Sequence, residues 1–229
     1  MAESILVLGI DTCGPTGSVA LGRLEGNLLE VLGQTELAGR SYSTTLVAAV
    51  GDLLSRAGFQ IKDVGAIVVV NGPGSFTGVR VGLSAVKGLA EPHSIPVAAV
   101  SRLAVLSAKA GLTSGALDAH RHEVFLRVGA DAGETRELLA GAAELAAIEH
   151  PPARVAVCDE SAAGLLGAAW PGAEVMEVEA PTAADALWLA APQIDAGDFV
   201  DVALLDGHYL RRSDAEIFGE APAKERQRP

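Results

Sequence analysis

The chain has 229 residues, of which 49% are hydrophobic and only 4% aromatic, so aliphatic side chains must fill its core. This length is enough for one large domain or two small ones. The formal net charge is −12, with 17 Lys and Arg against 29 Asp and Glu. So few cations argue against a chain that binds nucleic acid by itself, because that affinity comes from neutralising phosphates.

The cysteines and the N-terminal residues indicate the cellular compartment in which the protein is expected. Cys13 and Cys158 are far apart and form no CxxC pattern, which indicates a reducing environment and no metal cluster. No basic residue precedes the first apolar run, and no stretch approaches the roughly 18 uninterrupted apolar residues of a membrane span. We therefore expect a cytoplasmic protein that does not associate with a membrane.

The first hundred residues are predicted to form a βββαβα unit followed by a further strand. Apolar residues between 43 and 57 recur on one face of a helix, which Gly58 ends. The predicted elements, in chain order, are strands at 5–10, 18–21 and 28–36, a helix at 43–57, a strand at 67–70, a helix at 77–90 and a strand at 95–100.

A second α/β series begins near Ser114, after a helix that Ser101 can cap and that runs to Lys109. Its predicted elements are strands at 116–118 and 123–128, a helix at 138–148, a strand at 155–157, a helix at 161–169, a strand at 175–178 and a helix at 183–194. The division that follows is an N-terminal lobe over 1–103 and a smaller lobe over 104–217, whose last helix returns to the first lobe. Residues 218–229 are predicted to be a disordered tail.

Asp11 and Thr12 stand at the end of the first strand, before a hairpin rich in glycine and hydroxyl groups. Two interpretations are open. Such a hairpin can present backbone donors to the phosphates of a nucleotide, or it can be an ordinary turn in which Asp11 accepts turn hydrogen bonds. An ATPase of this kind needs a second phosphate loop, and the matching segment at 118–120 contains no glycine.

A glycine-rich turn over Gly72–Gly78 leads from a buried strand into a helix. It lacks the Lys of a Walker A loop, yet Gly74 and Ser75 are candidates to hold an anion at the helix N-terminus. Gly78, Gly82 and Gly88 lie within that helix, and each costs about 1 kcal/mol relative to alanine. Three such glycines imply a compensating close contact, so we favour packing against another helix or a partner.

Asp118, His120 and His122 form the other candidate constellation. At strand spacing the three side chains would share one face, and an H-x-H pair can bind zinc. No other histidine is placed to complete such a site, so solvated histidines are the favoured interpretation. Ser75, Thr77, Ser101 and Cys13 are available nucleophiles, but none lies in Gly-x-Ser-x-Gly and none has a base that the sequence identifies.

Seven short motifs are spread in order over nearly the whole chain: IDTC at 10–13, SVAL at 18–21, GPGSFTGVRVG at 72–82, KGLA at 87–90, VSRL at 100–103, DAHRHEVF at 118–125 and YLR at 209–211. Together they closely resemble the bacterial TsaB (YeaZ-like) family, and the glycine-turn motif is the specific part. The resemblance implies an actin/Hsp70/sugar-kinase-like (ASKHA) α/β fold with two lobes and duplicated βββαβα units. It also implies a role in placing threonylcarbamoyl on N6 of adenosine 37 (t6A) in tRNA.

The resemblance further implies an accessory subunit without its own catalytic centre. Its expected partners are the catalytic subunit TsaD, in a heterodimer, and the ATPase TsaE, in a ternary complex, with a homodimer when it is alone. The tRNA would be reached only through that complex. No cofactor is expected on this chain alone, because ATP and a metal are used by the partner subunits. Tyr42 and His120 stand where TsaB sequences often have His and Arg, which argues further against a catalytic or phosphate-binding centre.

In this family the helices at about 43–57 and 77–90 form the surface that meets TsaD or a second TsaB. The resemblance therefore implies an interface that contains Leu46, Val50, Leu53, Gly78, Gly82 and Val86. Two other functions stay open on the sequence. An ATP-dependent phosphotransferase is suggested by Asp11 and its hairpin, and a metallopeptidase by the glycoprotease labels that relatives have carried.

Overall fold

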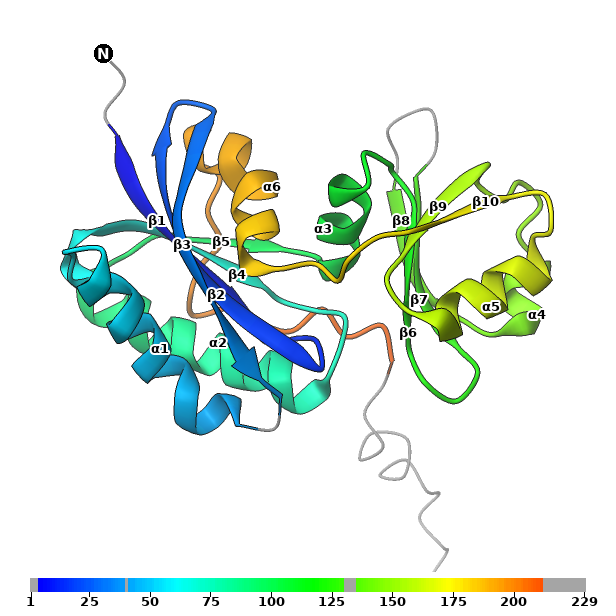
Figure 1. The fold of residues 1–229 in the computed structure, drawn as a ribbon, viewed down its shortest axis with the longest axis horizontal. Coiled ribbons are helices and arrows are strands. Elements are labelled where there is room, and N and C mark those ends of the chain that lie inside the picture. Colours follow the sequence, from blue (N-terminus) through cyan, green and yellow to red (C-terminus); the bar gives the residue numbers. More distant parts are fainter. Residues whose placement is uncertain (1–3, 40, 130–134, 212–229) are drawn as a thin grey trace, which may run out of the picture.

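The computed structural model describes residues 4–39, 41–129 and 135–211. These ranges form two α/β lobes, each built on one five-stranded sheet (Figure 1). The strand orders are β3-β2-β1-β4-β5 and β8-β7-β6-β9-β10, so the second sheet repeats the topology of the first. The predicted two-lobed fold with duplicated βββαβα units is confirmed. The predicted tail at 218–229 lies outside the described residues.

The first sheet combines an antiparallel meander, β1-β2-β3, with parallel pairing of β1 to β4 and of β4 to β5. Helices α1 and α2 cover one face and α6 covers the other (Figure 1). This lobe contains β1 (Ile5–Asp11), β2 (Thr16–Glu25), β3 (Leu28–Ala38), α1 (Tyr42–Arg56), β4 (Val64–Val70), α2 (Phe76–Ala90), β5 (Val97–Val100) and α6 (Ala183–Asp195).

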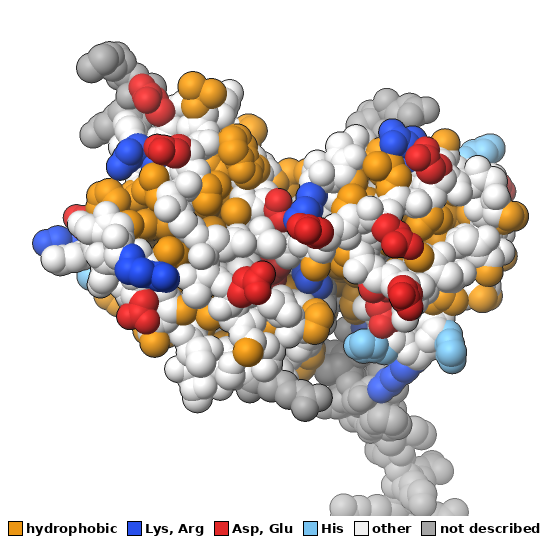
Figure 2. Space-filling model, viewed as in Figure 1, with side chains coloured by type: hydrophobic (Ala, Val, Ile, Leu, Met, Phe, Trp, Pro, Cys, Tyr) orange, Lys and Arg blue, Asp and Glu red, His pale blue; other side chains and the backbone are white. Residues whose placement is uncertain are grey.

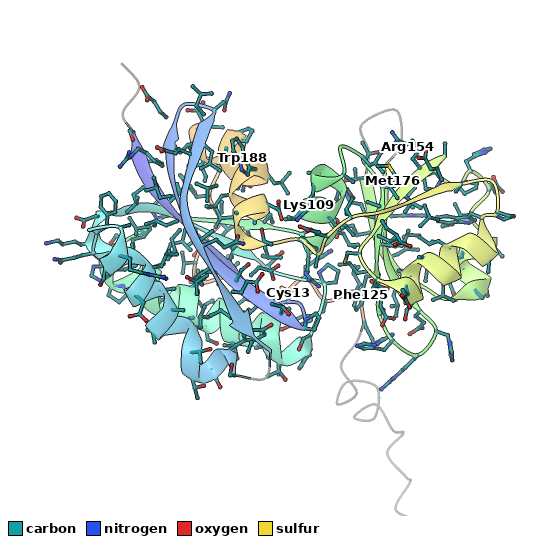
Figure 3. The ribbon with its side chains drawn as sticks, viewed as in Figure 1. Cys13, Lys109, Phe125, Arg154, Met176 and Trp188 are labelled. Carbon is teal, nitrogen blue, oxygen red and sulfur yellow. The ribbon has the colours of Figure 1, made fainter. Side chains whose placement is uncertain are left out.

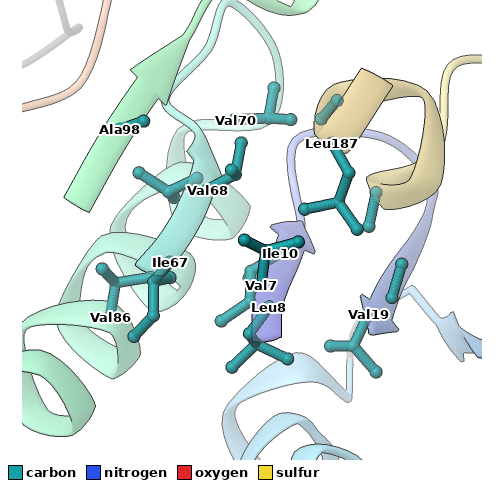
Figure 4. Packing of buried hydrophobic residues seen from close by; sticks show 14 of the residues in the cluster. Val7, Leu8, Ile10, Val19, Ile67, Val68, Val70, Val86, Ala98 and Leu187 are labelled. Atoms are coloured by element: carbon teal, nitrogen blue, oxygen red, sulfur yellow. The ribbon is translucent and has the colours of Figure 1, made fainter. Parts of the chain in front are cut away.

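Helices on both faces explain why β1 and β4 are nearly continuous apolar runs. Leu8, Ile10 and Ile67 are fully buried between the two layers of helices. Val86 of α2 and Leu187 of α6 close this core (Figure 4). Aliphatic side chains fill it, as the low aromatic content requires.

The second lobe has its own core on the far side of its sheet, where Leu145, Leu166 and Trp170 pack against β7 and β9. Helix α3 covers the other face through Leu103 and Leu106 and lies between the lobes (Figure 1). The elements are α3 (Arg102–Lys109), β6 (Gly115–Asp118), β7 (Val124–Gly129), β8 (Thr135–Ala140), α4 (Ala142–Ala146), β9 (Arg154–Val157), α5 (Glu160–Ala169) and β10 (Glu174–Glu177).

The helix predicted at 138–148 is wrong at its start. Residues 138–140, expected to begin a helix, belong to strand β8, which pairs with β7 along the edge of the second sheet. Only the short helix α4 follows it. Leu, Glu and Arg favour a helix in isolation, but pairing with a neighbouring strand outweighs that weak local preference.

The glycines of α2 make their close contact within the chain itself. A Cβ on Gly78 would lie 2.0 Å from the carbonyl oxygen of Thr12, and one on Gly82 would lie 2.4 Å from the Thr12 hydroxyl oxygen. That hydroxyl donates a hydrogen bond of 2.7 Å to the carbonyl of Gly78. The compensating contact of these two glycines is therefore packing within the chain, against the turn after β1, while their place in a partner interface stays a prediction.

The other four residues expected at the interface are also inside the chain. Leu46, Val50 and Leu53 of α1 are at most 5% exposed, and Val86 of α2 is fully buried. They hold the two helices against the first sheet, and their place in a partner interface stays a prediction. Among the described residues, no helix is long and apolar enough to cross a membrane.

Two alanine substitutions in α2 test this packing. Gly78→Ala should lower the free energy of unfolding by about 1–3 kcal/mol, because the new methyl group overlaps the Thr12 backbone. Gly88→Ala, in the same helix, should raise it by about 0.5–1 kcal/mol, because a Cβ there meets no atom within 4 Å. Urea unfolding measures both. Equal effects of the two changes would contradict the contact.

Candidate functional site: the cleft between the lobes

A cavity of about 1300 Å³ lies between the two lobes. Much of its wall comes from four segments: the β1–β2 turn, the start of α2, the β6–β7 turn and residues 208–211. Figure 3 labels one lining residue from each lobe, Cys13 and Phe125, at this junction. The cavity therefore brings together three of the motifs that the sequence analysis treated separately.

An ion pair closes the end of the cleft in the first lobe. Asp11 is 1% exposed and Arg102, which follows β5, is 5% exposed. The Asp11 Oδ2 and the Arg102 Nε are 3.6 Å apart, which is ion-pair distance but too long for a hydrogen bond. The other carboxylate oxygen accepts the backbone N–H of Cys13 at 2.8 Å. The negative charge of Asp11 is thus balanced within the protein, by the Arg102 guanidinium and the Cys13 N–H.

The four residues predicted as anion contacts separate into two pairs. Asp11 and Thr12 are engaged internally, by Arg102 and by the Gly78 carbonyl, and neither lines the cavity. Gly74 and Ser75 do line it. Ser75 also caps α2, because its hydroxyl accepts the N–H of Gly78 at 3.3 Å.

The thiols and the phenol around this ion pair are held protonated. Burial, and then the negative charge of Asp11, raises the pKa of Cys13 well above its ordinary value. The same two causes raise the pKa of Tyr42 to about 12, and its hydroxyl donates to the Gly14 carbonyl at 2.8 Å. Burial also raises the pKa of Cys158. A protonated thiol is a poor nucleophile, so neither cysteine is set up for covalent chemistry.

We expected Asp118, His120 and His122 to share one face of a strand, and this expectation is wrong. Residues 120, 121 and 122 have φ values of 58°, 55° and 62°, so they form a left-handed turn. His120 points to solvent and pairs with Asp118 at 2.9 Å. Within the described ranges, no group of three or more His, Cys, Asp and Glu residues could hold a metal ion.

Glu137 of β8 is the residue that the sequence analysis missed. Its carboxylate accepts hydrogen bonds from Ser101, at the entry of α3, and from His208, near the end of the described chain. It also pairs with Arg127 of β7 at 2.6 Å. These partners are up to 71 residues away in sequence, so no local pattern marks the residue.

The last described residues form a strap across the cleft. The N–H of His208 donates to the Asn71 carbonyl at 2.7 Å, and the ring of Tyr209 lies 5.0 Å from that of Phe76 at the start of α2. Arg211 donates to the Ala119 carbonyl at 2.7 Å and pairs with Glu123, both of the second lobe. The strap thus joins the first lobe to the second.

Acid should weaken the contacts of Glu137, which we call the lobe junction. Burial alone would raise the pKa of Glu137, but hydrogen bonds from His208, Ser101 and Arg127 outweigh it and hold the pKa below the usual 4.5. The ionised carboxylate therefore stabilises the fold above pH 4.5, and this contribution is lost as the pH falls through the folded-state pKa. Glu137→Gln should lower the unfolding free energy at pH 7 by about 2 kcal/mol and flatten its acid dependence.

The matched control for this change is Glu174→Gln. Glu174 is also paired with an arginine, Arg154, but both side chains are at least half exposed. Such a surface pair contributes little, so the control should unfold like the parent protein. Urea unfolding at pH values between 3 and 7 measures both variants, and a control as unstable as Glu137→Gln would contradict the lobe-junction assignment.

The fold is a two-lobed α/β architecture of the actin/Hsp70/sugar-kinase-like type. A family model described as TsaD, tRNA N6-adenosine threonylcarbamoyltransferase, matches residues 33–154. The chain is 37% identical over 123 residues to the tRNA threonylcarbamoyladenosine biosynthesis protein TsaB of Bacillus subtilis, which is 52% of each chain. It belongs to the TsaB/YeaZ branch of this family.

Solved structures agree with this relationship. A Pseudomonas aeruginosa protein described as similar to peptidase YeaZ aligns with a TM-score of 0.73 and 29% identity, over 92% of this chain and 100% of the other. Component A of the Acidaminococcus fermentans (R)-2-hydroxyglutaryl-CoA dehydratase aligns with a TM-score of 0.50 and 12% identity, over 84% of this chain and 99% of the other. This likeness shows a shared fold alone. The matches to curated TsaB proteins span about half the length of those relatives.

Proposed function

We propose that this chain is a non-catalytic scaffold subunit in the formation of t6A on tRNA, and that it binds a catalytic subunit of the TsaD type. The observation that carries the proposal is the family match over residues 33–154, because that range contains both α1 and α2. TsaE joins the assembled complex, and the isolated chain pairs with a second copy of itself.

The chemistry of the cleft supports an accessory role. Asp11, the acidic residue at the end of β1, is neutralised by Arg102, and the nearby thiol of Cys13 is held protonated. ATP and the metal belong to the partner subunits in this proposal. Acidic side chains lie on both lobes (Figure 2), and the net charge is −12, so the tRNA is bound through the complex.

The outward sides of α1 and α2 supply the proposed partner surface. The two helices pack beside each other on one face of the first sheet (Figure 1). Val47 of α1 is 60% exposed, and a Cβ on Gly51 or on Gly88 would meet nothing within 4 Å. An exposed apolar side chain and glycines without near neighbours on these two helices allow another helix to approach closely. The sequence prediction of a helical interface is thus kept, but at different residues.

A charged residue in place of the exposed Val47 should block the partner. Val47→Glu should weaken association with TsaD of the same organism at least about ten-fold, because the carboxylate would be buried without a counter-charge. Size-exclusion chromatography with light scattering detects the complex. The control is Leu28→Glu, which changes a residue that is 78% exposed at the β2–β3 hairpin, away from α1.

Two results would contradict the assignment: no complex between the parent chain and TsaD, or equal loss in both variants. The same complexes, supplied with TsaE, tRNA and the substrates of the reaction, should form modified adenosine only when this chain is present. Val47→Glu should then lower the yield in proportion to the loss of complex.

The alternative function, an ATP-dependent phosphotransferase, makes a separate prediction about metal. Such an enzyme needs a carboxylate free to hold Mg²⁺ beside the phosphates, whereas Asp11 faces Arg102. We therefore expect calorimetry of the isolated chain to show no heat of ATP binding that depends on Mg²⁺. Tight magnesium-dependent binding would instead support the phosphotransferase.

A further inference from the structure

An Asp-Gly sequence lies just before His208, where the strap begins. Asp206-Gly207 is the only Asp-Gly sequence in the chain, and Asn71-Gly72 is the only Asn-Gly sequence. At such sequences the backbone nitrogen of the glycine readily attacks the preceding side-chain carbonyl, because glycine places no side chain in the way. The fold brings the two sequences together, since the N–H of His208 donates to the Asn71 carbonyl at 2.7 Å.

The carboxylate of Asp206 lies against the nitrogen that would attack it. The side chain is exposed, and its Oδ1 accepts the N–H of Gly207 at 2.7 Å. Residues 205–209 belong to no helix or strand, so no ladder of hydrogen bonds holds this peptide unit. Two groups that are held this close react faster than groups that rotate freely.

The contact between Tyr209 and Phe76 explains why residue 207 is a glycine. A Cβ on Gly207 would lie 2.5 Å from the Tyr209 ring, so a side chain there would push that ring away from Phe76. Glycine thus keeps the strap in place. It also leaves out the side chain that normally slows attack on an aspartate, so Asp206 is open to reaction.

Asn71-Gly72 is held in the opposite way. The N–H of Asn71 donates to the Val100 carbonyl at 3.1 Å, and the Gly72 carbonyl accepts the N–H of Arg102 at 2.7 Å. Gly72 is buried, and the side-chain amide of Asn71 donates to the Asp206 carbonyl at 3.5 Å. Attack by the Gly72 nitrogen therefore needs local opening of this segment, which costs free energy.

We propose that Asp206-Gly207 is a site of spontaneous aspartate isomerisation that loosens the strap, whereas the fold protects Asn71-Gly72. The Gly207 nitrogen attacks the Cγ of the protonated Asp206 carboxyl group. A C–N bond forms, and the proton of the nitrogen leaves with the carboxyl hydroxyl group as water, which gives a five-membered succinimide ring. Water then adds to the ring and breaks the bond between the nitrogen and the α-carbonyl carbon, and the product is isoaspartate.

Isoaspartate lengthens the main chain by one carbon atom just before the strap. His208 donates to the Asn71 carbonyl through its backbone and lies 2.8 Å from Glu137 through its ring. Both contacts depend on the position of His208, so both weaken when the preceding main chain is longer. The product is a substrate for carboxyl methyltransferases that act on isoaspartate and return it to aspartate. The reaction needs no partner chain, so its test is separate from the test of the proposed function.

Ageing of the intact chain at physiological temperature tests the site. Isoaspartyl methyltransferase with a labelled methyl donor counts isoaspartate, and endoproteinase Asp-N, which does not cleave before isoaspartate, locates it. Deamidation of Asn71 is detected separately, because it raises the mass of its peptide by one unit. Isoaspartate should accumulate at Asp206 in the native chain. Asn71 should react at least about ten-fold more slowly in the native chain than in urea.

The chain kept in urea is the reference for both sites, because neither is held by the fold there. Asn71 should be the faster of the two under those conditions. Absence of isoaspartate at Asp206 in the native chain, after the unfolded chain has formed it, would overturn the proposal. Deamidation of Asn71 in the native chain as fast as isomerisation of Asp206 would overturn it as well.

Asp206→Glu is the informative variant, because it keeps the negative charge but would have to close a six-membered ring, which forms more slowly. It should lower methyl labelling at this position at least about ten-fold. Asp201→Glu is the matched control. Asp201 is exposed in the same segment, but Val202 follows it and its Oδ1 accepts the N–H of Ala203 at 2.9 Å. Equal labelling of Asp206→Glu and the parent protein would overturn the assignment.

The effect on the strap is measured on the aged protein itself. Chromatography separates the isoaspartate form, which should unfold at a lower urea concentration than the parent protein. Treatment with isoaspartyl methyltransferase and its methyl donor should restore the parent midpoint as aspartate returns. An isoaspartate form that unfolds like the parent protein would contradict the loosening of the strap.

Discussion

The approach of the β1–β2 turn to α2 is the contact on which both the first lobe and the cleft depend. The carbonyl and the hydroxyl of Thr12 occupy the space where side chains at 78 and 82 would begin. Only bare main chain allows the helix to come this near, and the hydrogen bond from Thr12 to Gly78 fixes its position. Two segments 66 residues apart therefore form one wall of the cleft.

A second constraint holds the other wall in place. Glu137 belongs to the sheet of the second lobe, but it binds Ser101 at the start of α3 and His208 of the returning strap. Because this carboxylate is partly buried and accepts hydrogen bonds from several side chains, removing one of them leaves polar groups unsatisfied. The two lobes are thus joined by a network of specific polar contacts as well as by chain connectivity.

The sequence predicts the fold well, because buried central strands and amphipathic helices leave strong periodic signals, as in β1, β4 and α1. It fails at β8, where the residues prefer a helix and only pairing with β7 makes them a strand. It also indicated that glycines in α2 imply a close neighbour, but spacing cannot say whether that neighbour is Thr12 or another protein. The lobe junction at Glu137 left no local signal, because its partners come from distant segments.

The arrangement of α2 links the cleft to the outer face of the first lobe. Its first turn lines the cavity, its inner side packs on β4 and on the Thr12 turn, and one flank lies beside α1. A rigid helix cannot shift on one of these sides without shifting on the others. Arg102, whose backbone N–H donates to the Gly72 carbonyl at 2.7 Å, is tied to the loop that precedes this helix. The position of α2 therefore sets the geometry of the cleft and of the proposed partner surface together.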